Sequence, residues 1–86
     1  MHITTEQQTK EKIMADINFE IKKHIGVIAN GSRGWRRELN IVSWNGGKPK
    51  YDIREWDENY EKMGRGITFT EDEGVALMAL LREELC

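Results

Sequence analysis

The chain alternates hydrophobic and polar residues through its first half and changes to a helical period near its end. Alternation with a period of two predicts half-buried strands. The predicted strands are residues 19–29, 35–44, 49–56 and the short segment 67–69. Glycine-containing turns at 30–34 and 45–47 separate the first three, as expected for antiparallel hairpins.

A capping box introduces the predicted C-terminal helix, residues 71–84. Thr70 provides the N-cap and Glu73 follows at the third helical position. The apolar arc of this helix is wider than one thin sheet needs. We therefore expect an α+β fold, with a curved four-stranded antiparallel meander, a helix covering its apolar face, and a second copy shielding what remains.

The hairpin around the 45–47 turn separates its side chains into two unlike faces. The apolar face holds Trp35, Leu39, Ile41, Tyr51 and Ile53. The opposite face holds Arg36, Asn40, Val42, Trp44, Lys50, Asp52, Arg54 and Trp56. A solvated face does not need two tryptophans, whereas indole rings beside Arg and Lys can stack unpaired bases and hold their phosphates.

The charge distribution favours the same region. The net charge of −2 is misleading as a guide to nucleic-acid binding, because the charge is unevenly distributed along the chain. Residues 17–56 carry eight Lys and Arg against four Asp and Glu, a net charge of +4, whereas residues 57–86 carry three against eight, a net charge of −5. The basic residues therefore gather where the aromatic residues are.

Other classes of function find little support in the sequence. Cys86 is the single cysteine, and His2 and His24 stand alone, so we expect no disulfide, metal site or cofactor. No nucleophile has a plausible base, which argues against an enzyme. No apolar run approaches a membrane span, and the polar N-terminus lacks a signal core, so we expect a cytoplasmic protein. We expect residues 1–16 to be mobile and 17–86 to form one domain.

Several short motifs occur in an order that resembles a known family. Trp44 precedes a turn containing Gly46-Gly47-Lys48, and a strand reading Asp52-Ile53-Arg54-Glu55-Trp56 follows. Next come Gly64-Arg65, Gly66-Ile67-Thr68 and the capped helix. This order resembles the positive cofactor 4 family of transcriptional coactivators, and most of all its small bacterial YdbC-like members. The resemblance covers roughly residues 19–85.

The resemblance implies a Whirly-like homodimer whose curved sheets hold single-stranded DNA with little sequence preference. It implies stacking on Trp44 and phosphate contacts from Lys48 and Lys50, with Arg54 and Trp56 on the same strand. The turn after Trp44 is one residue longer than in the eukaryotic pattern, which can displace both lysines. The Ser- and acid-rich regulatory segment of eukaryotic members has no counterpart here, so we do not expect regulation of that kind.

The sequence thus predicts single-stranded DNA binding in support of transcription, replication or repair, with proteins of those processes as further partners. The candidate binding residues are Lys22, His24, Arg36, Asn40, Trp44, Lys48, Lys50, Arg54 and Trp56. Single-stranded RNA binding and peptide docking on the aromatic face stay open as alternatives. Trp44 and Trp56 have packing as their alternative role, and Arg54 has a structural ion pair with Asp52 or Glu55.

Overall fold

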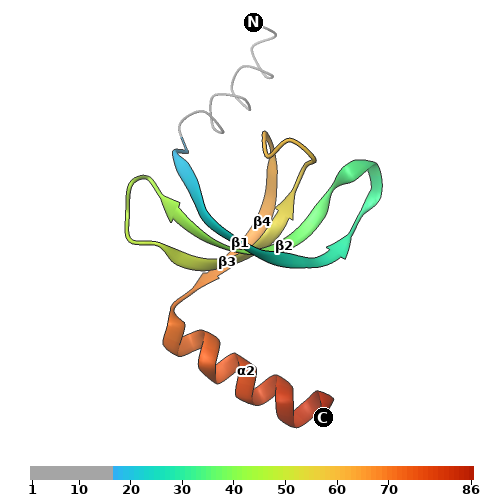
Figure 1. The fold of residues 1–86 in the computed structure, drawn as a ribbon, viewed down its shortest axis with the longest axis vertical. Coiled ribbons are helices and arrows are strands. Elements are labelled where there is room, and N and C mark those ends of the chain that lie inside the picture. The colour runs from blue at the N-terminus through green and yellow to red at the C-terminus, as the bar shows by residue number, and fades with distance from the viewer. Residues whose placement is uncertain (1–16) are drawn as a thin grey trace, which may run out of the picture.

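The computed structural model describes residues 17–86, so the expectation of a mobile segment at 1–16 lies outside the described residues. The strands are β1 (Phe19–Asn30), β2 (Arg36–Trp44), β3 (Lys50–Trp56) and β4 (Met63–Phe69), and the helix is α2 (Glu71–Leu85). A short 3-10 turn, η1 (Ser32–Gly34), joins β1 to β2. In Figure 1 the strands lie above α2, which is the last element along the sequence.

The strands form one antiparallel sheet in the order β1-β2-β3-β4, which confirms the predicted meander and the α+β class. The sheet is strongly curved, and both ends of its strands bend away from α2 (Figure 1). It therefore has a concave face, directed away from the helix, and a convex face, directed toward it. Residues paired across neighbouring strands place their side chains on the same face.

The edge strand β1 does not keep the single alternation that the sequence predicts. Its pairing with β2 shifts register three times, after Ile21, His24 and Val27. Each shift inserts an extra residue and exchanges the faces of the residues that follow. Phe19 consequently pairs with Trp44 on the concave face, although its sequence parity placed it with the apolar residues.

Strand β4 is longer than predicted because two glycines resemble a loop in the sequence. It begins at Met63 rather than at Ile67. Gly66 pairs with Arg54, and a Cβ atom at Gly66 would lie 2.3 Å from both the Arg54 Cβ and the Ile53 carbonyl oxygen. The strands approach so closely that only glycine fits, which is a recognised reason for glycine inside a strand.

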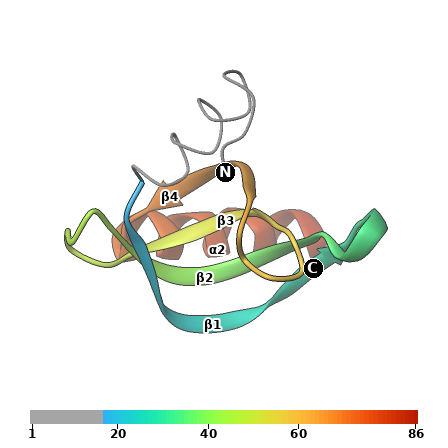
Figure 2. The ribbon, with the colours of Figure 1, turned by 90° about the horizontal axis from the view of Figure 1, so that it is seen from above.

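The capping box of α2 is present as predicted. Thr70 accepts a hydrogen bond from the Glu73 amide, and the Glu73 side chain accepts one from the Thr70 amide. The helix lies beneath the convex face (Figure 2), but none of its residues, all of which the structure describes, is buried. The helix therefore lies on the expected face of the sheet, but the apolar side chains between them are not buried as we expected.

The best-buried side chains lie on the concave face, where the sequence predicted an accessible face that binds nucleic acid. Val42 and Trp56 are fully buried, and so are the polar residues Glu38, Asn40 and Asp52. The convex face and α2 instead leave large apolar side chains exposed, including Ile67 at 58% and Leu80 at 63%. Side-chain alternation was read correctly in β2 and β3, but the covered side of the curved sheet is the polar, aromatic one.

Candidate nucleic-acid interface

The concave face gathers most of the residues that the sequence singled out. Register pairs Arg36 with Trp56 and Asn40 with Asp52, and β1 adds His24 opposite Asn40. From β2 and β3 this face receives Arg36, Glu38, Asn40, Val42, Trp44, Lys50, Asp52, Arg54 and Trp56. Lys22 lies at a register shift in β1, and Lys48 lies in the turn between β2 and β3.

Four aromatic rings line this face. Phe19 contacts both Trp44 and Trp56, with ring centroids 5.9 and 5.1 Å apart, and Tyr60 contacts Trp56 at 5.6 Å. Trp56 is fully buried between its neighbours, so it exposes no ring surface on which a base could stack. This placement corrects its assignment to an exposed binding face. Trp44 is only partly buried and is the tryptophan of the pair that remains accessible.

Trp44 is also in contact with an arginine. The Arg54 guanidinium carbon lies 4.5 Å from the centroid of the Trp44 ring, a cation–π arrangement. Asp52, which is fully buried, holds the guanidinium: Nε donates to Oδ1 at 2.8 Å and Nη2 donates to Oδ2 at 2.8 Å. Arg54 is thus part of a structural ion pair, with only 14% of its side chain exposed.

A second polar network surrounds the buried carboxylate of Glu38. Arg36 Nε donates to it at 2.7 Å, Asn40 Nδ2 at 3.1 Å, and the Tyr60 hydroxyl reaches both carboxylate oxygens. Burial acts to raise the pKa of Glu38, but the hydrogen bonds from Arg36, Asn40 and Tyr60 outweigh it and hold the pKa below its ordinary value. Glu38 is therefore a buried carboxylate stabilised in its charged form.

His24 joins this network from the edge strand. Its Nδ1 lies 2.8 Å from Asn40 Oδ1 and 3.4 Å from Glu38 Oε1, while about half of its side chain is exposed. Asn40, in contrast, is fully buried between Glu38 and His24. Asn40 therefore supports the face from within, and His24 lies at its accessible rim.

The accessible basic residues lie toward the edges of the concave face. Lys22, Lys48 and Lys50 are all exposed, and Lys22 Nζ lies 3.2 Å from a carboxylate oxygen of Glu20. Lys48 and Lys50 also line a hollow of about 460 Å³ beside the acidic first turn of α2. Their neighbourhood is consequently mixed in charge.

The sequence did not predict the role of three residues of this face, which are Phe19, Glu38 and Tyr60. Phe19 has the sequence parity of Ile21, Ile25 and Val27, and the register shifts of β1 leave no mark in that alternation. Tyr60 lies in a polar loop, where no periodic pattern marks it as a residue of this face. In the structure Asp57, three residues earlier, accepts hydrogen bonds from the amides of Glu61 and Lys62 and closes the turn that carries Tyr60. Glu38 has the sequence parity of this face, but a charged residue in a strand gives no sign in the sequence that it will be buried.

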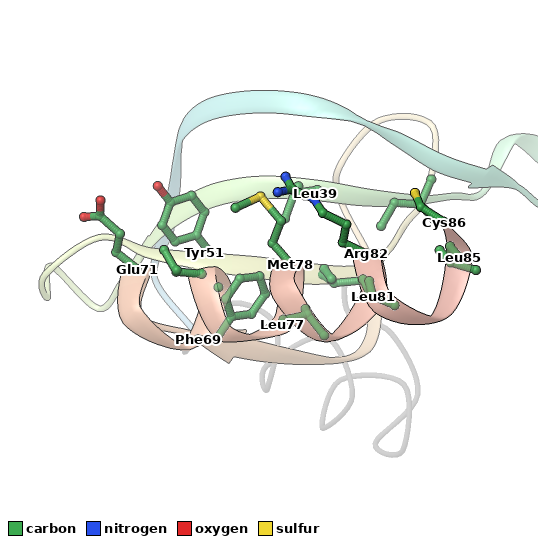
Figure 3. A pocket seen from close by; sticks show the side chains of 14 residues that line it. Leu39, Tyr51, Phe69, Glu71, Leu77, Met78, Leu81, Arg82, Leu85 and Cys86 are labelled. Atoms are coloured by element: carbon green, nitrogen blue, oxygen red, sulfur yellow. The ribbon is translucent and has the colours of Figure 1, made fainter.

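The convex face forms an open apolar groove against α2. Its volume is about 680 Å³. Figure 3 shows Leu39, Tyr51 and Phe69 of the sheet facing Leu77 and Met78 of the helix across this groove. The groove is lined mostly by apolar side chains that are open to solvent in this chain.

Two negative observations apply to the described part of the chain. Residues 17–86 contain no group of three or more His, Cys, Asp or Glu side chains placed to hold a metal ion. In the same residues, no helix has the length and apolar character needed to cross a membrane.

Comparison with known proteins gives two findings. Residues 32–80, more than half of the chain, match the family described as Transcriptional Coactivator p15 (PC4). A protein of Treponema pallidum (strain Nichols), named only as an uncharacterized protein, is 44% identical over 66 residues, which cover 77% of this chain and 78% of the relative. The family match begins in η1 and ends within α2, so it includes β2, β3 and β4.

Proposed function

Because this chain belongs to the Transcriptional Coactivator p15 (PC4) family, whose domains bind single-stranded DNA and have no enzymatic activity, we propose that it binds single-stranded DNA with little sequence preference. The observation that carries the proposal is the partly exposed Trp44 ring, which lies on the concave face within the matched segment. An indole ring can stack any base, because every base has a π-face.

The proposed contacts follow from accessibility. Trp44 stacks a base, and Lys48 and Lys50 neutralise phosphates near it. Lys22 and His24 contact the DNA from the β1 side of the face, where both side chains are about half exposed. Arg36, Asn40, Arg54 and Trp56 are largely or fully buried, and their part is to hold the face in shape.

We further propose that the protein is a homodimer joined through the convex groove. Exposed apolar side chains on α2 support this, since Val75, Met78 and Leu81 are 54, 52 and 47% exposed. A second copy supplies a self-complementary apolar surface and covers both helices at once. The same interface leaves the two concave faces open on the outside of the assembly.

The proposed cellular role is support of transcription, replication or repair, in the cytoplasm where bacterial DNA lies. Proteins of those processes are the further partners that this role implies. The cellular role and the further partners both depend on single-strand binding, and both are wrong if the protein does not bind single strands.

One titration tests the proposed function. Dye-labelled oligo-dT, oligo-rU and a duplex are titrated at two salt concentrations. The proposal expects oligo-dT to bind more tightly than the duplex, with an affinity that falls steeply with salt. Equal affinity for oligo-rU would extend the function to RNA. Absence of binding to all three, or equal or tighter binding of the duplex, would overturn it.

A further inference from the structure

Arg54 is held by more contacts than a surface arginine needs. Its Nε and Nη2 donate to the two oxygens of Asp52, while Nη1 donates to the Gly64 carbonyl oxygen at 3.3 Å and approaches the Met63 sulfur at 3.6 Å. The flat guanidinium group lies over the Trp44 ring in this arrangement. Both the in-plane donors and one planar surface of Arg54 are therefore engaged within the protein.

A two-pronged phosphate contact by Arg54 conflicts with this geometry. Four of its five N–H groups are directed at Asp52, Gly64 and Met63, so gripping a phosphate with two of them would require the guanidinium to leave Asp52, whose side chain is 0% exposed. Removing the partner of a buried charge is strongly destabilising, because the remaining charge is left uncompensated. The Arg54 guanidinium therefore stays paired with Asp52, and its planar surface contacts the Trp44 ring.

We infer that Arg54 is a positioning residue for Trp44: clamped by Asp52, its guanidinium fixes the indole so that the exposed part of the ring receives a base. This inference rests on the proposed function, and it assigns Arg54 a role different from phosphate binding. A preoriented ring loses less conformational freedom when a base stacks on it, which favours binding. Arg54 covers one surface of the Trp44 ring, so the base stacks on the part of the ring that Arg54 leaves exposed.

The test compares Arg54→Lys with Arg54→Gln in full-length protein carrying fluorotryptophan. Lysine keeps the positive charge beside Asp52 but lacks the planar fork. We expect Arg54→Lys to weaken oligo-dT binding by about fivefold to tenfold, since the stacking interaction loses its support. In fluorine NMR of the free protein, the Trp44 signal, assigned with Trp44→Phe, should shift or broaden while the Trp35 signal stays in place.

Salt dependence separates the two roles. A positioning role leaves the slope of log affinity against log salt unchanged in both variants. A phosphate contact instead predicts that Arg54→Lys keeps its affinity and that Arg54→Gln loses about 0.7 of slope, the value for one phosphate on a single strand. Arg37→Lys is the matched control, because Arg37 pairs with Glu55 on the convex face. It should change neither the Trp44 signal nor the affinity.

A second variant tests the same ion pair from the side of Asp52. Asp52→Asn keeps the shape of the clamp and removes its charge, so it should move the Trp44 signal in the same direction as Arg54→Lys. An unmoved Trp44 signal in both variants, or a loss of slope in Arg54→Gln, would overturn the inference. If the unmodified protein fails to bind oligo-dT, the proposed function is wrong, while the fluorine signal still decides whether Arg54 fixes Trp44.

Discussion

The hydroxyl of Tyr60 lies 3.0 and 2.8 Å from the two carboxylate oxygens of Glu38, and this contact holds the β3–β4 loop over the concave face. Tyr60 has a φ of 59°, a left-handed backbone conformation that bulky residues rarely adopt. Its ring also contacts Trp56 and lies under the Arg36 guanidinium. One loop residue thus closes the buried cluster, at the expense of local backbone strain.

Tyr60→Phe should lower the free energy of unfolding by about 1–2 kcal/mol, because it removes a hydrogen bond to a buried carboxylate and keeps the ring. Urea denaturation measures the change. Tyr51→Phe is the matched control: Tyr51 stacks on Phe69 on the convex face, and that contact survives the substitution. Equal losses in the two variants would show that the Glu38 contact is not special.

Stability should fall in acid because of Glu38. Its pKa in the folded protein is below the ordinary 4.5, so the unfolded chain takes up the proton first as the pH drops. The contribution is complete above pH 4.5 and disappears as the pH falls through the lowered value. Urea denaturation from neutral pH downward should show this loss. Glu38→Gln should flatten the acid part of the curve, and an unchanged curve would contradict the assignment.

Trp44→Ala should weaken oligo-dT binding by about 1–3 kcal/mol, the contribution of one stacked base. Trp44 also contacts Phe19 and Arg54, so some stability should be lost as well. Trp44→Phe separates the effects, since it retains an aromatic surface and should keep most of the affinity. Fluorescence anisotropy well below the melting temperature is the measurement. Lost stability with full affinity would move the stacking site elsewhere.

Lys50→Ala should reduce the slope of log affinity against log salt by about 0.7, as expected for one lost phosphate contact on a single strand. Titrations of oligo-dT at several salt concentrations give the slope. Lys23→Ala is a suitable control, because Lys23 pairs with Ile41 on the convex side. If both variants lower the slope equally, the effect reflects total charge rather than a contact at Lys50.

Leu81→Glu should convert the proposed dimer to a monomer. Analytical ultracentrifugation of the unmodified protein at micromolar concentration should give about 20 kDa, twice the 10.0 kDa of the chain. The variant should sediment at the chain mass, because dimerisation would bury an unpaired carboxylate. Circular dichroism checks that it remains folded. An unmodified protein that sediments as a monomer would end the dimer proposal.

The sequence predicted the elements well where local chemistry decides them. Alternation in β2 and β3 gave the correct partition of side chains, because the pleat of a regular strand has a fixed period. Thr70 and Glu73 located the start of α2, because a capping box is completed within one helical turn. The strands paired in the order in which their turns connect them.

Long-range contacts decide what the sequence could not show. Alternation says which residues share a face but not which face becomes covered. Burial of the polar face depends on the curvature of the sheet and on Tyr60 reaching Glu38 across 22 residues of sequence. Gly66 looked like a loop residue in the sequence. The atoms that leave room only for glycine there belong to Arg54 and Ile53, which lie on another strand.

The irregular register of β1 bears on how this protein avoids aggregation. A straight edge strand offers a regular row of unpaired amides and carbonyls that a strand of another molecule can extend. Three register shifts interrupt that row, and Lys22 and Lys23 place charge at the first of them. Uncontrolled growth of the sheet from this edge is thereby discouraged. The proposed dimerisation uses the broad apolar surface instead, where association would end once two copies have met.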